Sequence, residues 1–168
     1  MKLYPREYLD SVTDITMEFM NKNNLKGLIL DVDNTLIDFD KVLNTSVVEW
    51  CNKLKNGGIK MCILSNTNKI EKVTKVANEL DLHFFYFAKK PMSGGFKKAQ
   101  AYLELEPNEI GVVGDQIFTD VIGANISYMF SILVKPIDKR DILPTRIKRP
   151  LEKFVINCYL RKKNKGKK

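Results

Sequence analysis

The segment Gly27-Leu28-Ile29-Leu30 is an apolar run that is followed at once by Asp31-Val32-Asp33-Asn34-Thr35. Apolar residues without polar alternation are typical of a strand at the centre of a parallel sheet that is covered on both faces. Such sheets bind ligands at the carboxyl ends of their strands, where Asp31 and Asp33 are expected. Two carboxylates this close need a cation or a shared proton, which favours a hard ion such as Mg²⁺. A charged turn at the end of the strand is the alternative.

The rest of the chain alternates between strand-like and helix-like patterns up to a basic tail. Strands are predicted at 27–32, 59–64, 84–87, 110–113 and 131–134, and helices at 6–21, 45–56, 68–80, 96–105 and from about 119. This order predicts an α/β fold of three layers, in which helices flank a mainly parallel, Rossmannoid sheet with right-handed crossovers. The 168 residues have the length of one domain. We therefore expect one domain over 1–145, including the N-terminal helix, and a basic helix and tail over 146–168.

Several classes of protein are disfavoured by the composition. Cys51, Cys62 and Cys158 are odd in number and contain no Cys-x-x-Cys pair, which fits neither a disulfide framework nor a zinc site. His83 is the single histidine, so a Ser-His-Asp or Cys-His mechanism would depend on that residue alone. No stretch is long enough to span a bilayer, and the start of the chain lacks the apolar core of a secretory signal. We expect a cytoplasmic protein.

Four loops that follow predicted strands carry polar residues at the same edge of the sheet. They contain Asp31 and Asp33, then Ser65-Asn66-Thr67, then Lys89-Lys90-Pro91, and then Gly114-Asp115 through Asp120. Taken one at a time, these residues have ordinary structural interpretations as helix caps or solvated charges. Taken together, they supply acids, hydroxyl and amide groups that suit phosphate oxygens, and a cation. The convergence of all four loops favours a phosphate-handling site.

These residues resemble, in order and placement, the four motifs of the haloacid dehalogenase superfamily of phosphatases. The resemblance covers residues 27 to about 134. The segments 28–36, 88–91 and 114–121 look most similar to the YqeG branch of subfamily IIIA, which is similar to the mitochondrial phosphatidylglycerophosphate phosphatases. The resemblance therefore implies a Mg²⁺-dependent phosphatase with a HAD-like fold.

The resemblance also implies a role for each acid. Asp31 would attack phosphorus and form an aspartyl-phosphate, and Asp33 would act as general acid and then as general base. Mg²⁺ would be held by the Asp31 carboxylate, the Asp33 backbone carbonyl and Asp115. Asp120 would be either a further ligand or one shell away from the ion.

The remaining motif residues would contact the transferring phosphoryl group or support the loop. Ser65 and Lys90 would bind its oxygens, with help from Asn66, because phosphoryl transfer depends mostly on positioning and charge stabilisation. Thr35 would order the first loop. Lys89 is the competing choice for the cation, and Lys90 is preferred because it precedes Pro91 as in the family pattern.

The spacing of the motifs leaves no room for a cap domain. Asp31 and Ser65 are 34 residues apart, and Ser65 and Lys90 are 25 residues apart. Each interval is needed for a helix and a strand, whereas an independent domain needs at least about 50 residues. An open site suits a substrate that is large or held on a surface.

The basic charge of the chain is concentrated at its C-terminal end. Residues 135–168 contain 13 Lys or Arg and 3 Asp or Glu, whereas residues 1–134 carry a net charge of −2. Ile147, Leu151, Phe154, Val155 and Cys158 can form one helical face before the basic run 161–168. A basic amphipathic helix of this kind is typical of a membrane-surface element. A helix packed on the body with a solvated tail is the alternative.

Three functions follow from these observations. The favoured one is dephosphorylation of phosphatidylglycerophosphate to phosphatidylglycerol by an enzyme peripheral to the inner face of an anionic membrane. The second is a phosphatase for nucleic-acid ends or a phosphoprotein. Nucleic acid ranks lower because no basic stretch is interleaved with aromatic residues. The third is a non-catalytic scaffold, which is disfavoured because every acid that the chemistry requires is present.

Overall fold

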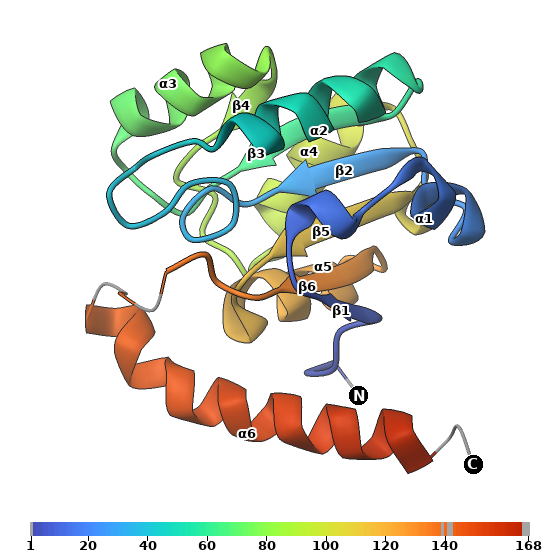
Figure 1. Cartoon of the computed structure of the whole chain (residues 1–168), viewed down its shortest axis with the longest axis vertical. Helices are drawn as coiled ribbons and strands as arrows, with labels where there is room; N and C mark the ends of the chain where they lie inside the picture. The colour runs from blue at the N-terminus through green and yellow to red at the C-terminus, as the bar shows by residue number, and fades with distance from the viewer. Residues whose placement is uncertain (1, 139, 141–142, 166–168) are drawn as a thin grey trace.

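One parallel sheet of six strands forms the centre of the computed structural model, in the order β1-β6-β5-β2-β3-β4 (Figure 1). The strands are β1 (Glu7–Leu9), β2 (Gly27–Leu30), β3 (Lys60–Leu64), β4 (His83–Phe85), β5 (Ile110–Gly114) and β6 (Phe130–Val134). The structure describes residues 2–138, 140 and 143–165, without the side chains of 143–146 and 165. The predicted α/β fold with a parallel sheet is confirmed.

Helices connect the strands and cover both faces of the sheet. They are α1 (Met17–Lys22), α2 (Thr45–Asn56), α3 (Ile70–Leu80), α4 (Ser93–Leu103), α5 (Ile122–Ile126) and α6 (Leu143–Lys165). Two 3₁₀ turns, Val12–Asp14 and Pro107–Glu109, and a π-helical turn, Ile117–Val121, complete the described chain. In this part of the chain no cap domain is inserted, as the motif spacing predicted.

The alternation of side chains along β2 divides the core into two layers. Leu28 and Leu30 pack into a cluster with residues of α2 and α3, whereas Ile29 faces α4 on the other side. All four residues of β2 are buried, so the strand lies between two apolar layers and needs no polar alternation. The carboxyl end of this buried strand is where Asp31 begins.

The prediction of one helix over residues 6–21 is wrong. Residues 7–9 form β1, which pairs in parallel with β6 at the edge of the sheet. Two caps then interrupt the segment: Ser11 caps the 3₁₀ turn, and Thr16 caps α1 by accepting a hydrogen bond from the Phe19 amide at 3.1 Å. Of the apolar residues at helical spacing, Val12 and Ile15 are buried and Leu9 and Phe19 are partly buried. They belong to separate elements rather than to one helix, because strand pairing and caps override a weak periodicity.

Helix α6 lies along one side of the molecule and packs on the body (Figure 1). Val155 and Ile156 contact a cluster that contains Ile117 and Leu133. No helix in the described part of the chain is long and apolar enough to cross a membrane. The division at residue 145 stays a prediction, and residues 166–168 of the predicted basic run lie outside the described residues.

Candidate active site

Acidic side chains from three places in the sequence meet at the carboxyl ends of β2 and β5. Asp31 directly follows β2, Asp115 directly follows β5, and Asp120 lies in the π-helical turn after it. Among the described residues, one carboxylate oxygen of each lies within 4.8 Å of the others, and all three side chains are buried. Strand register explains the meeting, because Leu30 pairs with Val113 and therefore brings the two following loops side by side.

Lys90 supplies a buried cation between two of these acids. Its Nζ lies 2.6 Å from Oδ1 of Asp31 and 2.6 Å from Oδ1 of Asp120. Burial opposes the charge, but the flanking Asp120 and Asp31 carboxylates raise the pKa of the Lys90 ammonium. Lys89, the competing choice, is exposed and places its ammonium over the ring of Phe87. The geometry therefore favours Lys90 as the cation of the site.

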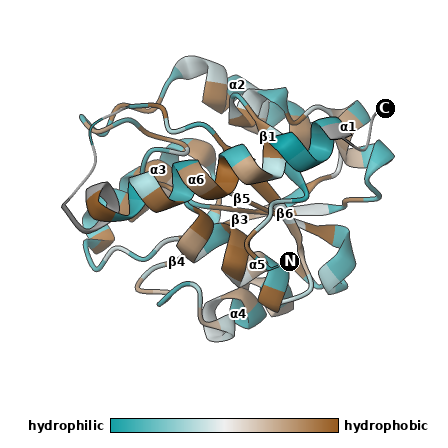
Figure 2. Ribbon diagram, turned by 90° about the horizontal axis from the view of Figure 1, so that it is seen from below, coloured by the Kyte–Doolittle hydropathy of each residue, from teal (hydrophilic) through white to brown (hydrophobic). Residues whose placement is uncertain are grey.

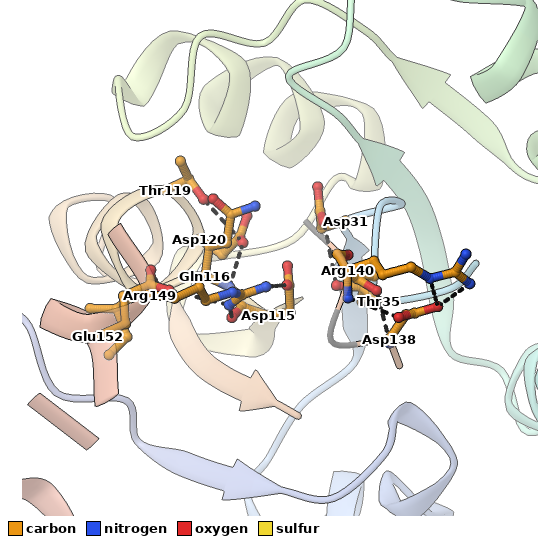
Figure 3. Close-up of polar contacts among 12 residues, drawn as sticks. Asp31, Thr35, Asp115, Gln116, Thr119, Asp120, Asp138, Arg140, Arg149 and Glu152 are labelled. Atoms are coloured by element: carbon orange, nitrogen blue, oxygen red, sulfur yellow. Dashed lines mark hydrogen bonds and ion pairs between the residues drawn. The ribbon is translucent and has the colours of Figure 1, made fainter. Parts of the chain in front are cut away.

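Asp115 is held by a residue that the motifs did not include. Arg149 of α6 binds Oδ2 of Asp115 and also donates to the Asp115 backbone carbonyl at 2.9 Å (Figure 3). The other carboxylate oxygen of Asp115, Oδ1, is buried and has no hydrogen-bond partner among the described residues. A buried carboxylate oxygen without a partner is costly unless something binds it, and a metal ion would do so.

Glu152 attaches α6 to the same loop. Its carboxylate is buried, and Oε1 accepts hydrogen bonds from the backbone amides of Ile117 at 2.7 Å and Phe118 at 3.3 Å. Its other oxygen accepts from Arg149 at 3.2 Å. Glu152 thus caps the free amides at the start of the π-helical turn that carries Asp120. Arg149 and Glu152 are positioning residues for the acidic loop.

Asp33 lies outside the cluster of buried acids and is partly exposed to solvent. Its side chain is half exposed and forms an ion pair with Lys72, which comes from the first turn of α3. The structure therefore does not bring the Asp33 carboxylate into the cluster of Asp31, Asp115 and Asp120. An acid that must exchange protons with a leaving group and with water is well served by a partly solvated position.

The loop after β3 is hydrogen-bonded to the loop after β4. Ser65 is buried directly after β3, and its hydroxyl accepts a hydrogen bond from the Thr67 amide at 3.3 Å. Asn66 accepts from the Lys90 amide at 2.6 Å and donates to the Lys90 carbonyl at 3.1 Å. Asn66 therefore holds the backbone of Lys90, while the roles of Ser65 and Asn66 toward phosphate stay predictions.

The loop after β2 is held by a hydrogen bond within the loop and by hydrogen bonds to the segment after β6. Thr35 donates to Oδ2 of Asp31 at 3.3 Å (Figure 3). Asn34, in the left-handed region at φ 59°, accepts from the Asp138 amide at 3.0 Å and donates to the Arg140 carbonyl at 3.1 Å. The segment after β6 thus supports the turn that separates Asp31 from α2.

Gly114 leaves room for Asp120 to approach the sheet. A Cβ atom at position 114 would lie 2.3 Å from Cγ of Asp120, a distance that no real side chain tolerates. Asp120 uses the space to accept hydrogen bonds from the Gln116 amide and the Thr119 hydroxyl, both at 3.2 Å (Figure 3). Steric contact with Asp120 therefore explains why glycine occupies this position of the fourth motif.

The electrostatics of the cluster favour a bound cation. Asp31, Asp115 and Asp120 contribute three carboxylates, whereas Lys90 and Arg149 contribute two cations. Burial raises the pKa of Asp31 despite the opposing Lys90, and burial together with the Asp31 charge raises the pKa of Asp115. An excess of buried acid over buried base is relieved by a divalent ion, whose preferred ligands are such oxygens.

Sequence reasoning missed three residues whose side chains contact the candidate acids or the loop that carries them. They are Lys72, Arg149 and Glu152. Lys72 and Arg149 are two among many basic residues, so nothing in the sequence distinguished them. Glu152 does carry a signal, because it is the single acidic residue between Arg146 and Lys168. A lone acid in a basic helix is more readily explained by a specific partner than by solvation.

Comparisons with known sequences find a matching family model and a similar protein. The model of a family described as "Mitochondrial PGP phosphatase" matches residues 2–137. The chain is also 36% identical over 159 residues to "Probable phosphatase YqeG" of Bacillus subtilis (strain 168). The aligned region covers 94% of this chain and 92% of that protein.

Two solved structures show the same fold. An uncharacterized protein from Listeria monocytogenes serotype 4b is 21% identical with a TM-score of 0.56, covering 71% of this chain and 86% of that one. An uncharacterized protein from Corynebacterium glutamicum is 20% identical with a TM-score of 0.55, covering 68% of this chain and 88% of that one.

Proposed function

The chain belongs to the mitochondrial PGP phosphatase family, and from this membership we propose that it hydrolyses phosphatidylglycerophosphate to phosphatidylglycerol through an aspartyl-phosphate. The predicted resemblance to YqeG-like phosphatases of the haloacid dehalogenase superfamily is confirmed, and with it the assignment as a phosphatase. The substrate and the chemical steps are the proposal.

The observation that carries the proposal is the buried cluster of Asp31, Asp115 and Asp120 around Lys90. The carboxylates fit Mg²⁺, because they are hard oxygen donors and Oδ1 of Asp115 has no other partner among the described residues. Asp31, Asp115 and the Asp33 carbonyl would hold the ion, with Asp120 either binding it directly or lying one shell away. When bound, Mg²⁺ supplies charge that lets an anionic nucleophile approach an anionic phosphate.

In the first step, Asp31 attacks phosphorus while Asp33 gives a proton to the leaving oxygen. The P–O bond to the substrate breaks as the bond to the Asp31 oxygen forms. In the second step, Asp33 takes a proton from water, the water oxygen attacks phosphorus, and phosphate leaves as Asp31 is regenerated. Lys90 and Ser65 bind the transferring oxygens and stabilise their charge.

The open site supports a lipid substrate. In the described part of the chain no inserted domain closes over a small molecule, and a phosphate group presented at a bilayer surface would reach the site at the edge of the sheet. The proposed enzyme is cytoplasmic and peripheral to the inner face of an anionic membrane, where its substrate resides.

A substrate panel tests the proposal. Phosphatidylglycerophosphate in mixed micelles, a 5′-phosphorylated oligonucleotide and small sugar phosphates are each incubated with the protein and Mg²⁺, and phosphate release is measured. We expect kcat/KM for the phospholipid to exceed the others by about tenfold or more, since its contacts extend beyond the phosphate. A higher kcat/KM for the oligonucleotide or a sugar phosphate would identify a different substrate class.

Mg²⁺ is expected to stabilise the folded protein through Asp115. At free Mg²⁺ about 100-fold above its dissociation constant, the gain is about 2.7 kcal/mol, because the unfolded chain lacks the site. Thermal unfolding with and without Mg²⁺ measures it. Asp115→Asn should lose most of the Mg²⁺-induced rise in Tm, and the exposed control Asp81→Asn should keep it. Equal rises in all three proteins would contradict a site at Asp115.

A further inference from the structure

Helix α6 presents an outer face on which large apolar side chains are exposed. Ile147 is 69% exposed, Leu151 61% and Phe154 68%. Their spacing of four and three residues puts them on one side of the helix, and half-buried Cys158 continues the row. We call Ile147, Leu151 and Phe154 the outer face of α6. Isolated exposed apolar residues are ordinary, but an aligned row on one helix is typical of a binding surface.

The opposite side of α6 is anchored to the body. Arg149 and Glu152 bind the acidic loop, and Tyr159 is buried with its ring 5.9 Å from that of Tyr4. Near the end of the helix, Nζ of Lys163 lies 2.7 Å from the Glu7 carboxylate. The helix is therefore packed on the body through one side, as the alternative interpretation of its sequence expected, and it carries exposed apolar residues on the other side.

Basic residues surround the outer face. Lys148, Lys153, Arg161 and Lys162 are exposed. The sequence continues this charge with Lys165, Lys167 and Lys168. Figure 2 views the molecule from the side of α6 and shows the helix crossing in front of the sheet, with hydrophobic and hydrophilic residues interspersed along it.

We propose that the outer face of α6 docks on the surface of an anionic phospholipid bilayer. Such a surface satisfies both kinds of side chain, because the apolar residues enter the boundary of the acyl region while the basic residues meet anionic headgroups. A nucleic acid would attract the charges but leave the apolar row in water. A second copy of the chain would bring two basic helices against each other, which is unfavourable.

The proposed docking surface rests on the proposed function and extends it. It identifies the membrane surface at which the enzyme would meet its substrate. Ile147 is two residues from Arg149, and Arg149 contacts Asp115. The outer face therefore begins within one helical turn of a residue that contacts the acidic cluster. A bilayer that binds α6 would bring its headgroups near the edge of the sheet where the phosphate is cleaved.

Vesicle co-sedimentation of the full-length protein tests the proposal. Vesicles contain phosphatidylcholine alone or phosphatidylcholine mixed with phosphatidylglycerol. We expect binding to the mixed vesicles only, and weaker binding as salt is added. Replacing all three outer-face residues with Gln (Ile147→Gln, Leu151→Gln, Phe154→Gln) should weaken partitioning by about tenfold or more, because the buried apolar area is lost. Lys148→Gln and Lys153→Gln should each weaken it about fivefold.

A matched control separates the outer face from general surface hydrophobicity. Tyr102 and Tyr128 are exposed aromatic residues outside α6, and the variant Tyr102→Gln/Tyr128→Gln should bind vesicles like the wild type. Hydrolysis of p-nitrophenyl phosphate should be the same in the outer-face variant and the wild type, because none of the replaced residues contacts the acidic cluster.

Two outcomes would overturn the docking surface. One is vesicle binding that ignores phosphatidylglycerol or the outer-face substitutions. The other is a dimer in solution, measured by light scattering, that these substitutions dissociate. The proposed function fails in a different way. If lipid binding follows the substitutions but no phosphomonoester is hydrolysed, the docking surface stands and the catalytic proposal falls.

Discussion

Asp31→Asn should reduce phosphate release from p-nitrophenyl phosphate by about 10³-fold or more. The substitution keeps the shape of the side chain but replaces the carboxylate that we propose as the nucleophile with an amide, which could not form the proposed aspartyl-phosphate. The fold should survive, because the change removes one of three clustered buried acids rather than a cation. Initial rates in saturating Mg²⁺ measure the effect, with Tm recorded on the same sample to confirm folding.

Asp81→Asn is the matched control for this variant. Asp81 is an exposed carboxylate in the left-handed region that ends α3, a conformation that asparagine also adopts. It precedes β4 and so lies at the amino-terminal edge of the sheet, opposite the cluster. The Asp81→Asn variant should hydrolyse p-nitrophenyl phosphate at the wild-type rate. If Asp31→Asn remained as active as Asp81→Asn, Asp31 would not be the nucleophile.

Lys90→Met should lower the free energy of unfolding by about 3–5 kcal/mol in the absence of Mg²⁺. Methionine fills much of the same space, but the buried carboxylates of Asp31 and Asp120 lose the ammonium 2.6 Å from each of them. An uncompensated buried charge costs far more than the loss of a surface ion pair. Urea unfolding, followed by tryptophan fluorescence, gives the free energy.

Lys89→Met, at the exposed neighbouring position, is the control and should change the free energy of unfolding by less than about 0.5 kcal/mol. In the double variant Asp31→Asn/Lys90→Met, part of the loss should be recovered, because one of the two unpaired acids is gone. Similar losses for Lys89→Met and Lys90→Met would show that the buried ammonium contributes little.

Much of this fold was predictable because its strands carry strong local signals. The four residues of β2 are apolar and buried, and Asp31 follows where the strand ends. The same pattern located β3 and β5, and the short motif intervals correctly excluded a cap domain in the described chain. The aromatic strand was less well predicted: β4 ends at Phe85, and Tyr86 and Phe87 are exposed.

The N-terminal segment shows where local reasoning failed. Its apolar residues have helical spacing, but β1 is formed because the edge of β6 offers backbone hydrogen-bonding groups to Glu7–Leu9. Nothing in the local sequence of the segment indicates that this pairing partner is available. The backbone bond beside this pairing joins the Arg6 amide to the Ser131 carbonyl at 3.0 Å, and these two residues are 125 positions apart in the sequence. A local pattern does not contain a partner so distant.

The sequence by itself determined the parallel α/β architecture and the edge at which Asp31, Lys90, Asp115 and Asp120 meet, since both follow from apolar periodicity and from the loops that end buried strands. Only the tertiary structure decided which charges pair. Lys90 rather than Lys89 joins the acids because its side chain points into the buried cluster, and Arg149 reaches Asp115 because α6 folds back onto the loop after β5. Ion pairs depend on distance and burial in space, and neither is encoded in the spacing of residues along the chain.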